Sequence, residues 1–201
     1  QLEVDTGKSL QDVTPAATCV DLNRAGCALM EVVTGPELRS GEEAAAFVAQ
    51  FQQLLRTIGT SDGNMEDGSL RVDVNVSVRR RADGESSRRV EVKNLNSTRS
   101  IARAVAYEAA RHVDAMNEGG AVDAETRGFD AKAGSTFPLR DKEAKLDYRF
   151  MPEPDIPPVV LSAEEVEAMR ASVPELPAAV ALRLQRDFGL SEAQARHFTK
   201  E

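Results

Sequence analysis

The sequence predicts an α+β fold, in which an antiparallel sheet carries helices on one side. Residues 70–79 alternate strictly between apolar and polar side chains, which is the period of a strand with one buried face. A polar loop leads from them to a second alternating run at residues 89–93, so the two runs predict an antiparallel hairpin. Stretches with helical periodicity at residues 40–58 and 98–117 flank this hairpin, and that order of elements indicates an α+β layout.

The composition is typical of a soluble globular protein. The 201 residues are 41% hydrophobic and 29% charged, which is enough for one sizeable domain and an appendage. The net charge of −8 excludes general nucleic-acid binding by phosphate neutralisation, so any nucleic-acid contact must be local. No run approaches the roughly 18 apolar residues of a membrane span and no signal peptide is recognisable, so we expect a cytoplasmic protein. The chain begins at Gln1 rather than Met, and we expect a part of a longer protein.

The N-terminal region predicts short strands. Residues 1–9 read as a strand end and a glycine turn, without the first glycine of a phosphate-binding loop. Residues 18–33 hold two strand-like pieces around a turn at residues 23–26. The second piece is apolar except for Glu31, and an acid in such a strand needs a partner. A salt bridge is the usual partner, and a metal ion is the more specific one.

The two flanking helices have clear sequence signals. Ser40 and Glu43 form a capping-box pattern before the first helix, and Gly59 ends it. In the second helix, residues 98–117, we expect the buried stripe to consist of Ile101, Val105, Ala109, Val113 and Met116. The two histidines, His112 and His197, fall in helical patterns outside any cluster of metal ligands, and the two cysteines, Cys19 and Cys27, lack a CxxC motif. Ordinary histidines, on a helix surface or partly buried, and reduced thiols are therefore expected.

The hairpin has one apolar and one ionic face. The ionic face carries Arg71, Asp73, Asn75, Ser77 and Arg79, followed on the second strand by Glu91 and Lys93. Solvent is the ordinary neighbour of such a face. However, Asp, Asn and Ser are poor strand formers, which favours a functional role. The second strand also runs into residues 93–97 at a helix start, where backbone N–H groups and the positive helix end favour an anion.

The remainder of the chain changes character twice. Residues 121–147 read as polar and irregular; Arg127, Arg140 and Lys142 there either line a polyanion site or are solvated. Four prolines give residues 147–158 an extended path that holds Glu153 and Asp155. Ser162 and Glu165 cap a short helix, a second helix at residues 177–188 ends at Gly189, and Ser191 begins a third.

Several long runs, in the same order along the chain, resemble the B subunit of the bacterial aspartyl/glutamyl-tRNA amidotransferase. They are Val20–Gly26 (VDLNRAG), Glu31–Thr34 (EVVT), Met65–Asn75 (MEDGSLRVDVN), Glu91–Ser97 (EVKNLNS), Glu125–Arg127 (ETR) and Asp147–Asp155 (DYRFMPEPD). The resemblance implies one part of a ligase that works in a heterotrimer, with an amidase (the A subunit) and a small third protein (the C subunit). Such an enzyme binds misacylated Glu-tRNA(Gln) or Asp-tRNA(Asn), phosphorylates the side-chain carboxylate with ATP and Mg²⁺, and amidates it with ammonia channelled from the amidase.

The resemblance also implies an architecture. The catalytic region, or cradle, is expected to be similar to the glutamine synthetase catalytic domain, with a helical domain after it. We therefore place the cradle at residues 1–165, with its N-terminal part preceding Gln1, and the beginning of the helical domain at residues 166–201.

Site residues follow from this chemistry. Phosphoryl transfer to a carboxylate needs hard oxygen ligands for Mg²⁺ and a cation for the developing phosphate charge. The ionic face offers Asp73 and Asn75 for metal or substrate, and Arg71 and Lys93 for phosphate.

The resemblance adds residues from other segments to this site. The implied metal ligands are Glu3, Glu31 and Asp73, and the implied binding residues for nucleotide or the aminoacyl end are Asn75, Asn94, Asn96 and Glu153. A helix-capping role is an equal alternative for Asn94 and Asn96. Val4 stands where the family often has a second acid, which leaves a non-catalytic module that binds tRNA or a partner, with a degraded metal site, as the alternative function.

Overall fold

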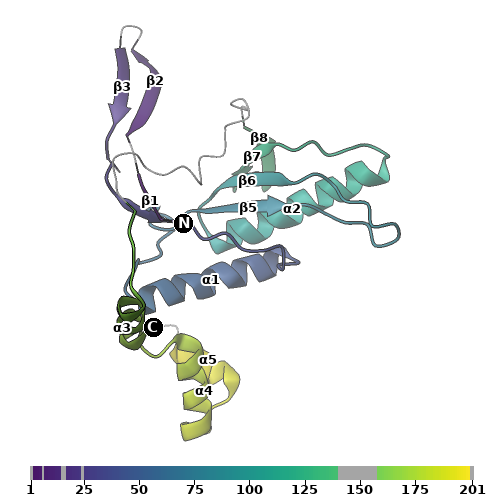
Figure 1. The fold of residues 1–201 in the computed structure, drawn as a ribbon. Helices are drawn as coiled ribbons and strands as arrows, with labels where there is room; N and C mark the ends of the chain where they lie inside the picture. Colours follow the sequence, from purple (N-terminus) through teal and green to yellow (C-terminus); the bar gives the residue numbers. More distant parts are fainter. Residues whose placement is uncertain (1, 6, 15–16, 24, 140–157, 200–201) are drawn as a thin grey trace. The chain divides into compact units, whose positions relative to one another are not determined.

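The computed structural model describes residues 2–5, 7–14, 17–23, 25–139 and 158–199 (Figure 1). The chain divides into two compact units. The first consists of Gln1–Glu37 and Leu146–Asp155, and the second of Leu38–Lys145 and Ile156–Glu201.

The described residues of the first unit form two small antiparallel sheets. Strand β1 (Leu2–Val4) pairs with β4 (Ala28–Met30), and β2 (Lys8–Thr14) pairs with β3 (Ala17–Asp21). The two strand-like pieces expected around residues 23–26 are therefore confirmed as β3 and β4. Gly26 adopts a φ of +82° in the turn between them, and its N–H donates to the carbonyl of Asp5 at 2.8 Å. Few side chains other than glycine adopt this conformation without strain.

The second unit is built on a four-stranded sheet. Its strands are β5 (Val72–Val76), β6 (Val90–Leu95), β7 (Thr126–Asp130) and β8 (Ser135–Pro138), in that spatial order. The predicted hairpin is confirmed as β5 and β6, which pair antiparallel. The sheet as a whole is mixed, because β6 and β7 pair in parallel. The expectation of a purely antiparallel sheet is therefore wrong.

Helix α2 (Thr98–Asn117) explains the parallel pair. Parallel neighbours need a long crossover between them, and this 20-residue helix connects β6 to β7. The expectation of irregular structure at residues 121–147 is also wrong for β7 and β8. Both strands are short, and their sequences, TRGFD and STFP, include glycine, aspartate and proline, which are depleted in strands.

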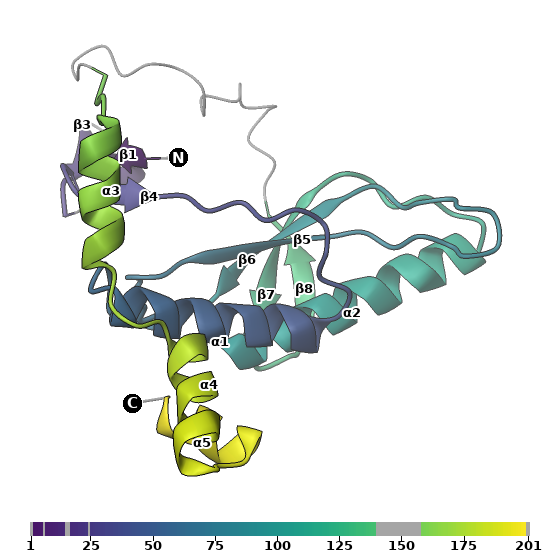
Figure 2. The same ribbon diagram turned by 60° about the horizontal axis from the view of Figure 1, so that its bottom comes forward.

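Helices α1 (Gly41–Thr57) and α2 cover one face of this sheet (Figure 2). Both begin at a serine cap, as the side chain of Ser40 accepts from the N–H of Glu43 and that of Ser97 accepts from the N–H of Ser100, each at 3.1 Å. The predicted helix limits are confirmed. The core lies between these helices and the sheet, where Val90, Val92 and Ile101 are fully buried. Each such side chain contributes about 1.5–3 kcal/mol to folding.

Among the described residues, three helices follow the sheet. They are α3 (Ala163–Ser172), α4 (Pro177–Phe188) and α5 (Glu192–Phe198). The capping box of Ser162 and Glu165 is present, and Gly189 ends α4 with a φ of +66°, as predicted. Within the described ranges, no helix combines the length and the apolar character that a bilayer crossing requires.

Candidate active site

The outer face of the sheet, which faces away from α1 and α2, carries the polar side chains of the hairpin. Residues along both strands alternate between buried and more exposed positions, as the sequence predicts. The strand register aligns Asn75 of β5 with Glu91 of β6, and Glu91 with Thr126 of β7. The strands place Asp73, Asn75, Glu91, Lys93 and Thr126 together on this outer face.

Lys93 lies between two carboxylates at the centre of this face. Its Nζ is 2.6 Å from Oδ2 of Asp73 and 3.2 Å from Oε1 of Glu91. Thr126 Oγ1 donates to the other oxygen of Glu91 at 3.2 Å. The side chains of Lys93 and Asp73 remain 38% and 44% exposed, so the ammonium group is held in place while solvent and ligands can still reach it.

The two carboxylates also set the charge state of Lys93. Burial alone lowers the pKa of Lys93, but the hydrogen bond to Asp73 and the charges of Asp73 and Glu91 outweigh it and raise the pKa above its ordinary value of 10.5. Lys93 is therefore a permanent cation at neutral pH. Such a group can bind a phosphate or stabilise developing negative charge, but it cannot act as a general base.

A bulge in β6 fixes where Lys93 lies. Val74 pairs with Val92, whereas Val72 pairs with Leu95, so β6 holds one extra residue opposite β5. Asn94 lies at this bulge with a φ of +65°, the only non-glycine residue at positive φ among those that the structure describes. The extra residue returns Leu95 to the core, where it is 4% exposed. The bulge thus lets both Val92 and Leu95 be buried while Lys93 stays on the outer face.

The start of α2 organises the asparagine-rich segment. Ser97 is the N-cap, and its hydroxyl donates to Oγ of Ser100 at 2.9 Å. Oδ1 of Asn96 accepts weakly from the same Ser100 hydroxyl at 3.4 Å. Asn96 therefore lies just before the cap, exposed to solvent, while Asn94 is exposed at the bulge. Both asparagines are thus exposed and close to Lys93 along the chain, and their role in ligand binding stays a prediction.

The other predicted site residues lie elsewhere. Arg71 is exposed just before β5, with its guanidinium beside Gly68, and has no ion-pair partner among the described residues. Glu3 lies in β1 opposite Leu29, and Glu31 follows β4; both belong to the first unit. Glu153 falls outside the described residues, as do Asp155, Arg140 and Lys142. In the part of the chain that the structure describes, no three His, Cys, Asp or Glu side chains converge as a metal site, so the magnesium ligands stay a prediction.

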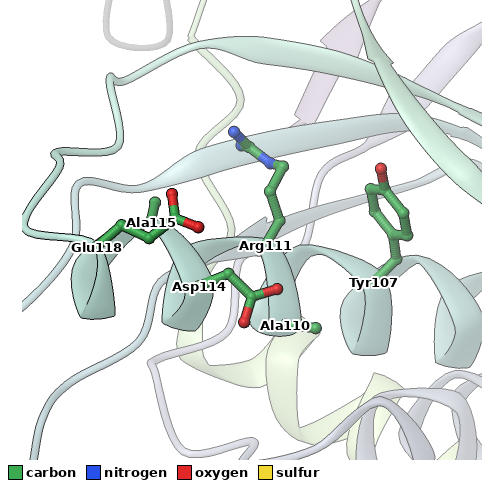
Figure 3. A pocket seen from close by; sticks show the side chains of 6 residues that line it. All are labelled: Tyr107, Ala110, Arg111, Asp114, Ala115 and Glu118. Carbon is green, nitrogen blue, oxygen red and sulfur yellow. The ribbon is translucent and has the colours of Figure 1, made fainter.

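Two of the shallow hollows among the described residues of the second unit could hold a ligand. One lies over the outer face and is lined by Asn75, Arg89, Glu91, Ala124, Glu125 and Thr126. The other lies on the flank of α2, where Figure 3 shows Tyr107 and Arg111 rising on the same side of the helix. The second hollow contains no predicted site residue, and its Arg111 is bound to Glu108. The outer-face hollow is therefore the better candidate.

A buried ionic network lies on the opposite, helix-covered face of the sheet. Glu108 of α2 is fully buried and accepts from Arg111, with Nη2 at 2.8 Å, and from the hydroxyl of Thr136 on β8. Arg127 of β7 approaches Glu108 at 3.3 Å and donates to Glu125 at 2.9 Å. Burial raises the pKa of Glu108, but these hydrogen bonds and the two arginine charges hold it below its ordinary value. Arg127 is thus an internal partner of α2, not a solvated loop residue.

His112 of α2 completes this network, and the burial of α2 corrects two expectations. His112 is fully buried, with Nδ1 2.9 Å from the hydroxyl of Ser87, so it is neither a helix-surface histidine nor a partly buried one. Its Nε2 lies 3.2 Å from Glu108, but without hydrogen-bond geometry to any described residue. The buried face of α2 also includes Ile101 and Ala104, whereas Val113 is 45% exposed. The expected apolar stripe is therefore confirmed at Ile101, and Val105 packs against the core, but the stripe is wrong at Val113 and misses the buried Ala104.

Glu91 and Thr126 were not among the predicted site residues. Glu91 alternates with Lys93 on the hairpin, and this spacing was a sufficient signal for it. Thr126 had no such signal, because its strand was not recognised. Together they support Lys93 from the side opposite Asp73.

Comparison with known proteins connects this geometry to a family. The sequence matches the family described as GatB/GatE catalytic domain over residues 1–167. It is 56% identical over 187 residues to the chloroplastic/mitochondrial glutamyl-tRNA(Gln) amidotransferase B subunit of Ostreococcus tauri, covering 92% of this chain and 35% of that protein. It is 50% identical over 201 residues to the aspartyl/glutamyl-tRNA(Asn/Gln) amidotransferase B subunit of Acidiphilium cryptum, covering 100% of this chain and 41% of that protein.

A third relative is the chloroplastic/mitochondrial glutamyl-tRNA(Gln) amidotransferase B-2 subunit of Micromonas commoda, which is 53% identical over 196 residues, 98% of this chain and 37% of that protein. The chain thus spans about two fifths of the length of these relatives. The match over residues 1–167 includes the whole sheet and the Asp73–Lys93 pair. On these grounds the chain belongs to the GatB/GatE catalytic domain family.

Proposed function

We propose that this chain is the carboxylate-activating part of the B subunit of a tRNA-dependent amidotransferase. The observation that carries the proposal is the Asp73–Lys93 pair on the outer face, inside the segment that matches the family. Its substrate is Glu-tRNA(Gln) or Asp-tRNA(Asn), whose side-chain carboxylate attacks the γ-phosphorus of ATP. The bond from phosphorus to the ADP oxygen breaks and an acyl phosphate forms. Ammonia then attacks the carbonyl carbon, inorganic phosphate leaves, and the amide remains.

Lys93 has the properties that phosphoryl transfer requires. A permanent cation at a fixed position stabilises the negative charge that develops on the transferring phosphoryl group. Asp73 and Glu91 orient the ammonium group and keep it protonated. Arg71 is the second candidate for phosphate binding.

The donor set of the outer face also fits a hard divalent cation. Asp73, Asn75 and Glu91 offer carboxylate and amide oxygens, which are the ligands that Mg²⁺ prefers. When bound, Mg²⁺ would neutralise phosphate charge. We propose Asp73 as its protein ligand on this face, with Glu3 and Glu31 as further ligands, and Asn94, Asn96 and Glu153 as binding residues for nucleotide or the aminoacyl end.

The wider assignments follow from the same proposal. We propose that the complete protein works in the cytoplasm, in a heterotrimer with an amidase (the A subunit) and a small third protein (the C subunit). We further propose that residues 1–165 form a cradle similar to the glutamine synthetase catalytic domain, and that residues 166–201 begin a helical domain.

The substitution Asp73→Asn tests the proposal in the assembled enzyme. The carboxylate is lost at nearly constant shape, so we expect transamidation to fall at least about 100-fold, while the glutaminase activity of the amidase largely survives. Amidated tRNA and glutamate release, measured side by side, check this. Asp187→Asn on α4, also an exposed acid, is the control and should leave both activities unchanged. Retained transamidation in Asp73→Asn would contradict the site assignment.

The alternative is a non-catalytic module that binds tRNA or a partner. Val4, where the family often has an acid, is the feature that favours it. The two functions are separated by measuring phosphate release from ATP with and without aminoacylated tRNA. A complex that binds tRNA but releases no such phosphate would be the non-catalytic module.

A further inference from the structure

The connection between β5 and β6 concentrates positive charge in an acidic protein. Residues 79–89 hold five arginines against two acids, Asp83 and Glu85, in a chain whose net charge is −8. The segment also lies next to the outer face, since it joins the two strands that carry Asp73 and Lys93. Its charge is therefore a local feature with a defined position.

One of the five arginines has a structural role. Arg80 Nη1 lies 3.0 Å from Asp83 and 2.8 Å from Glu85, and its Nη2 donates to the carbonyl of Met116 at the end of α2 at 3.1 Å. Arg80 therefore uses both acids of the segment. It also fastens the connection to the helix.

The other four arginines form what we call the hairpin-tip cluster: Arg79, Arg81, Arg88 and Arg89. All four are exposed, and none has an ion-pair partner among the described residues. Four like charges in one short connection repel each other, which opposes folding. A bound polyanion would remove that repulsion.

The backbone that carries the cluster is held in place. Arg79 forms a β-bridge with Ser86, and the N–H of Val78 donates to the hydroxyl of Ser87 at 2.9 Å. The same hydroxyl contacts Nδ1 of buried His112 at 2.9 Å. The cluster is thus pre-organised by the sheet and by α2, so a ligand would not have to order this loop.

The cluster is continuous with the candidate site. Arg89 lines the same hollow as Asn75 and Glu91. Arg79 follows Asp73 by six residues of extended chain, roughly 20 Å at the rise of a β-strand. One extended polyanion along the outer face would therefore contact both the cluster and the Asp73–Lys93 pair.

We propose that the hairpin-tip cluster binds the phosphate backbone of the RNA whose aminoacylated end enters the outer-face site. This inference rests on the proposed function, which supplies RNA as the substrate. Arginine is well suited to phosphate, since its planar fork donates two hydrogen bonds to a pair of oxygens. No aromatic residue occurs between residues 61 and 106, so the surface lacks a platform for stacking bases. The contact therefore positions the RNA without reading its sequence.

The test replaces all four cluster arginines by glutamine in the assembled enzyme. We expect the KM for aminoacylated tRNA to rise about tenfold or more, with kcat at saturating tRNA and the KM for ATP nearly unchanged. Binding titrations use the same tRNA without its aminoacyl group. A plot of the logarithm of the binding constant against the logarithm of the salt concentration should become shallower by about three to four, because each lost phosphate contact accounts for about one. Four arginine-to-lysine substitutions keep the charge and should retain the salt slope.

A matched control removes the same charge elsewhere. Arg39, Arg170, Arg186 and Arg196, replaced together by glutamine, are also exposed and lie outside the hairpin. This control should leave KM and salt slope near those of the unaltered enzyme. Equal effects of the two sets would overturn the inference, and so would a loss confined to kcat. The variant with four glutamines could also fail to assemble with the other subunits while its tRNA binding stays unchanged. That result would identify an acidic protein surface as the partner of the cluster and would also overturn the inference.

The binding titration needs neither ATP nor glutamine, so the two proposals fail separately. If the unaltered complex binds tRNA with a cluster-dependent salt slope but makes no amide, the proposed function fails and the inference stands. If the glutamine variant transamidates with an unchanged KM, only the inference fails.

Discussion

At the scale of single residues, the outer face depends on one backbone conformation. Asn94 takes a φ of +65° at the bulge, and this lets Lys93 face Asp73 while Leu95 is buried. For residues other than glycine, the left-handed region costs about 1–2 kcal/mol, and asparagine is among the few that visit it. The position of Lys93 is therefore determined by its neighbour as well as by its own ion pairs.

Substitutions of Asn94 separate its backbone role from its side-chain role. Asn94→Ala should lower the free energy of unfolding by about 1 kcal/mol, whereas Asn94→Gly should leave it within about 0.5 kcal/mol, because glycine accepts positive φ. Urea unfolding of the two variants measures the difference. Equal stabilities would refute the backbone role. If the stable glycine variant loses transamidation, the Asn94 side chain takes part in binding.

At the scale of elements, the sequence signals were strong wherever periodicity was uninterrupted. The hairpin, α1 and α2 could be predicted because each runs for several turns or several alternations between caps and turns. Strands β7 and β8 could not, because their sequences, TRGFD and STFP, do not alternate between apolar and polar residues. The polar part of the buried face of α2 could not be predicted for the same reason: Glu108 is buried only because Arg127 and Thr136, on those two strands, are its partners.

The site could be predicted only in part, for related physical reasons. Asp73 and Lys93 were visible because alternation places them on one face. The bulge at Asn94 had no signal, since the alternating pattern ends at Lys93. A short irregularity of this kind depends on the partner strand, and its effect on Leu95 appears only once the strands are paired.

The packing of α1 against α2 predicts that replacing Gly41 by alanine destabilises the fold, although helix propensity alone predicts the opposite. Alanine is normally better than glycine in a helix by up to about 1 kcal/mol. At Gly41, however, an added Cβ would lie 2.4 Å from the carbonyl oxygen and 2.9 Å from the Cα of Ala102, and backbone cannot move aside cheaply. Gly41→Ala should therefore destabilise the fold by about 1–3 kcal/mol.

Thermal or urea unfolding checks the Gly41 prediction. Glu42→Ala, at the next position of the same helical turn, is the control; it adds no atoms toward α2 and should change stability by well under that amount. A Gly41→Ala variant as stable as the unaltered chain would mean that the two helices can separate without loss.

At the scale of the whole molecule, the structure separates two kinds of charge. The outer face and the hairpin tip keep their charges exposed, where ligands can reach them. The network around Glu108 buries its charges between α2, β7 and β8, where they hold elements together. Breaking a buried pair is strongly destabilising, because the remaining charge loses its partner. The global stability of the fold should therefore respond to the protonation of this network.

His112 gives that response a defined direction. Burial lowers the pKa of His112 below its ordinary value of 6.5, and the charge of Arg111 acts in the same sense, although Glu108 opposes them. The unfolded chain therefore binds a proton at a higher pH than the folded chain does. Stability is fully present above about pH 6.5 and is lost as the pH falls toward the folded-state pKa, because protons favour the unfolded chain. The lowered pKa of Glu108 acts in the same direction, but only below its ordinary value of 4.5.

Urea unfolding between pH 7 and pH 5 measures this effect. The free energy of unfolding should decrease with falling pH, and His112→Gln should remove most of that slope, whatever its effect on absolute stability. His197→Gln alters an exposed histidine on α5 and should leave the slope intact. Because Glu108 titrates lower, the interval separates the histidine from the carboxylate. If the free energy of unfolding of His112→Gln still decreases with falling pH, another group causes the acid sensitivity. The contact between His112 and Ser87 would then have no role in the pH response.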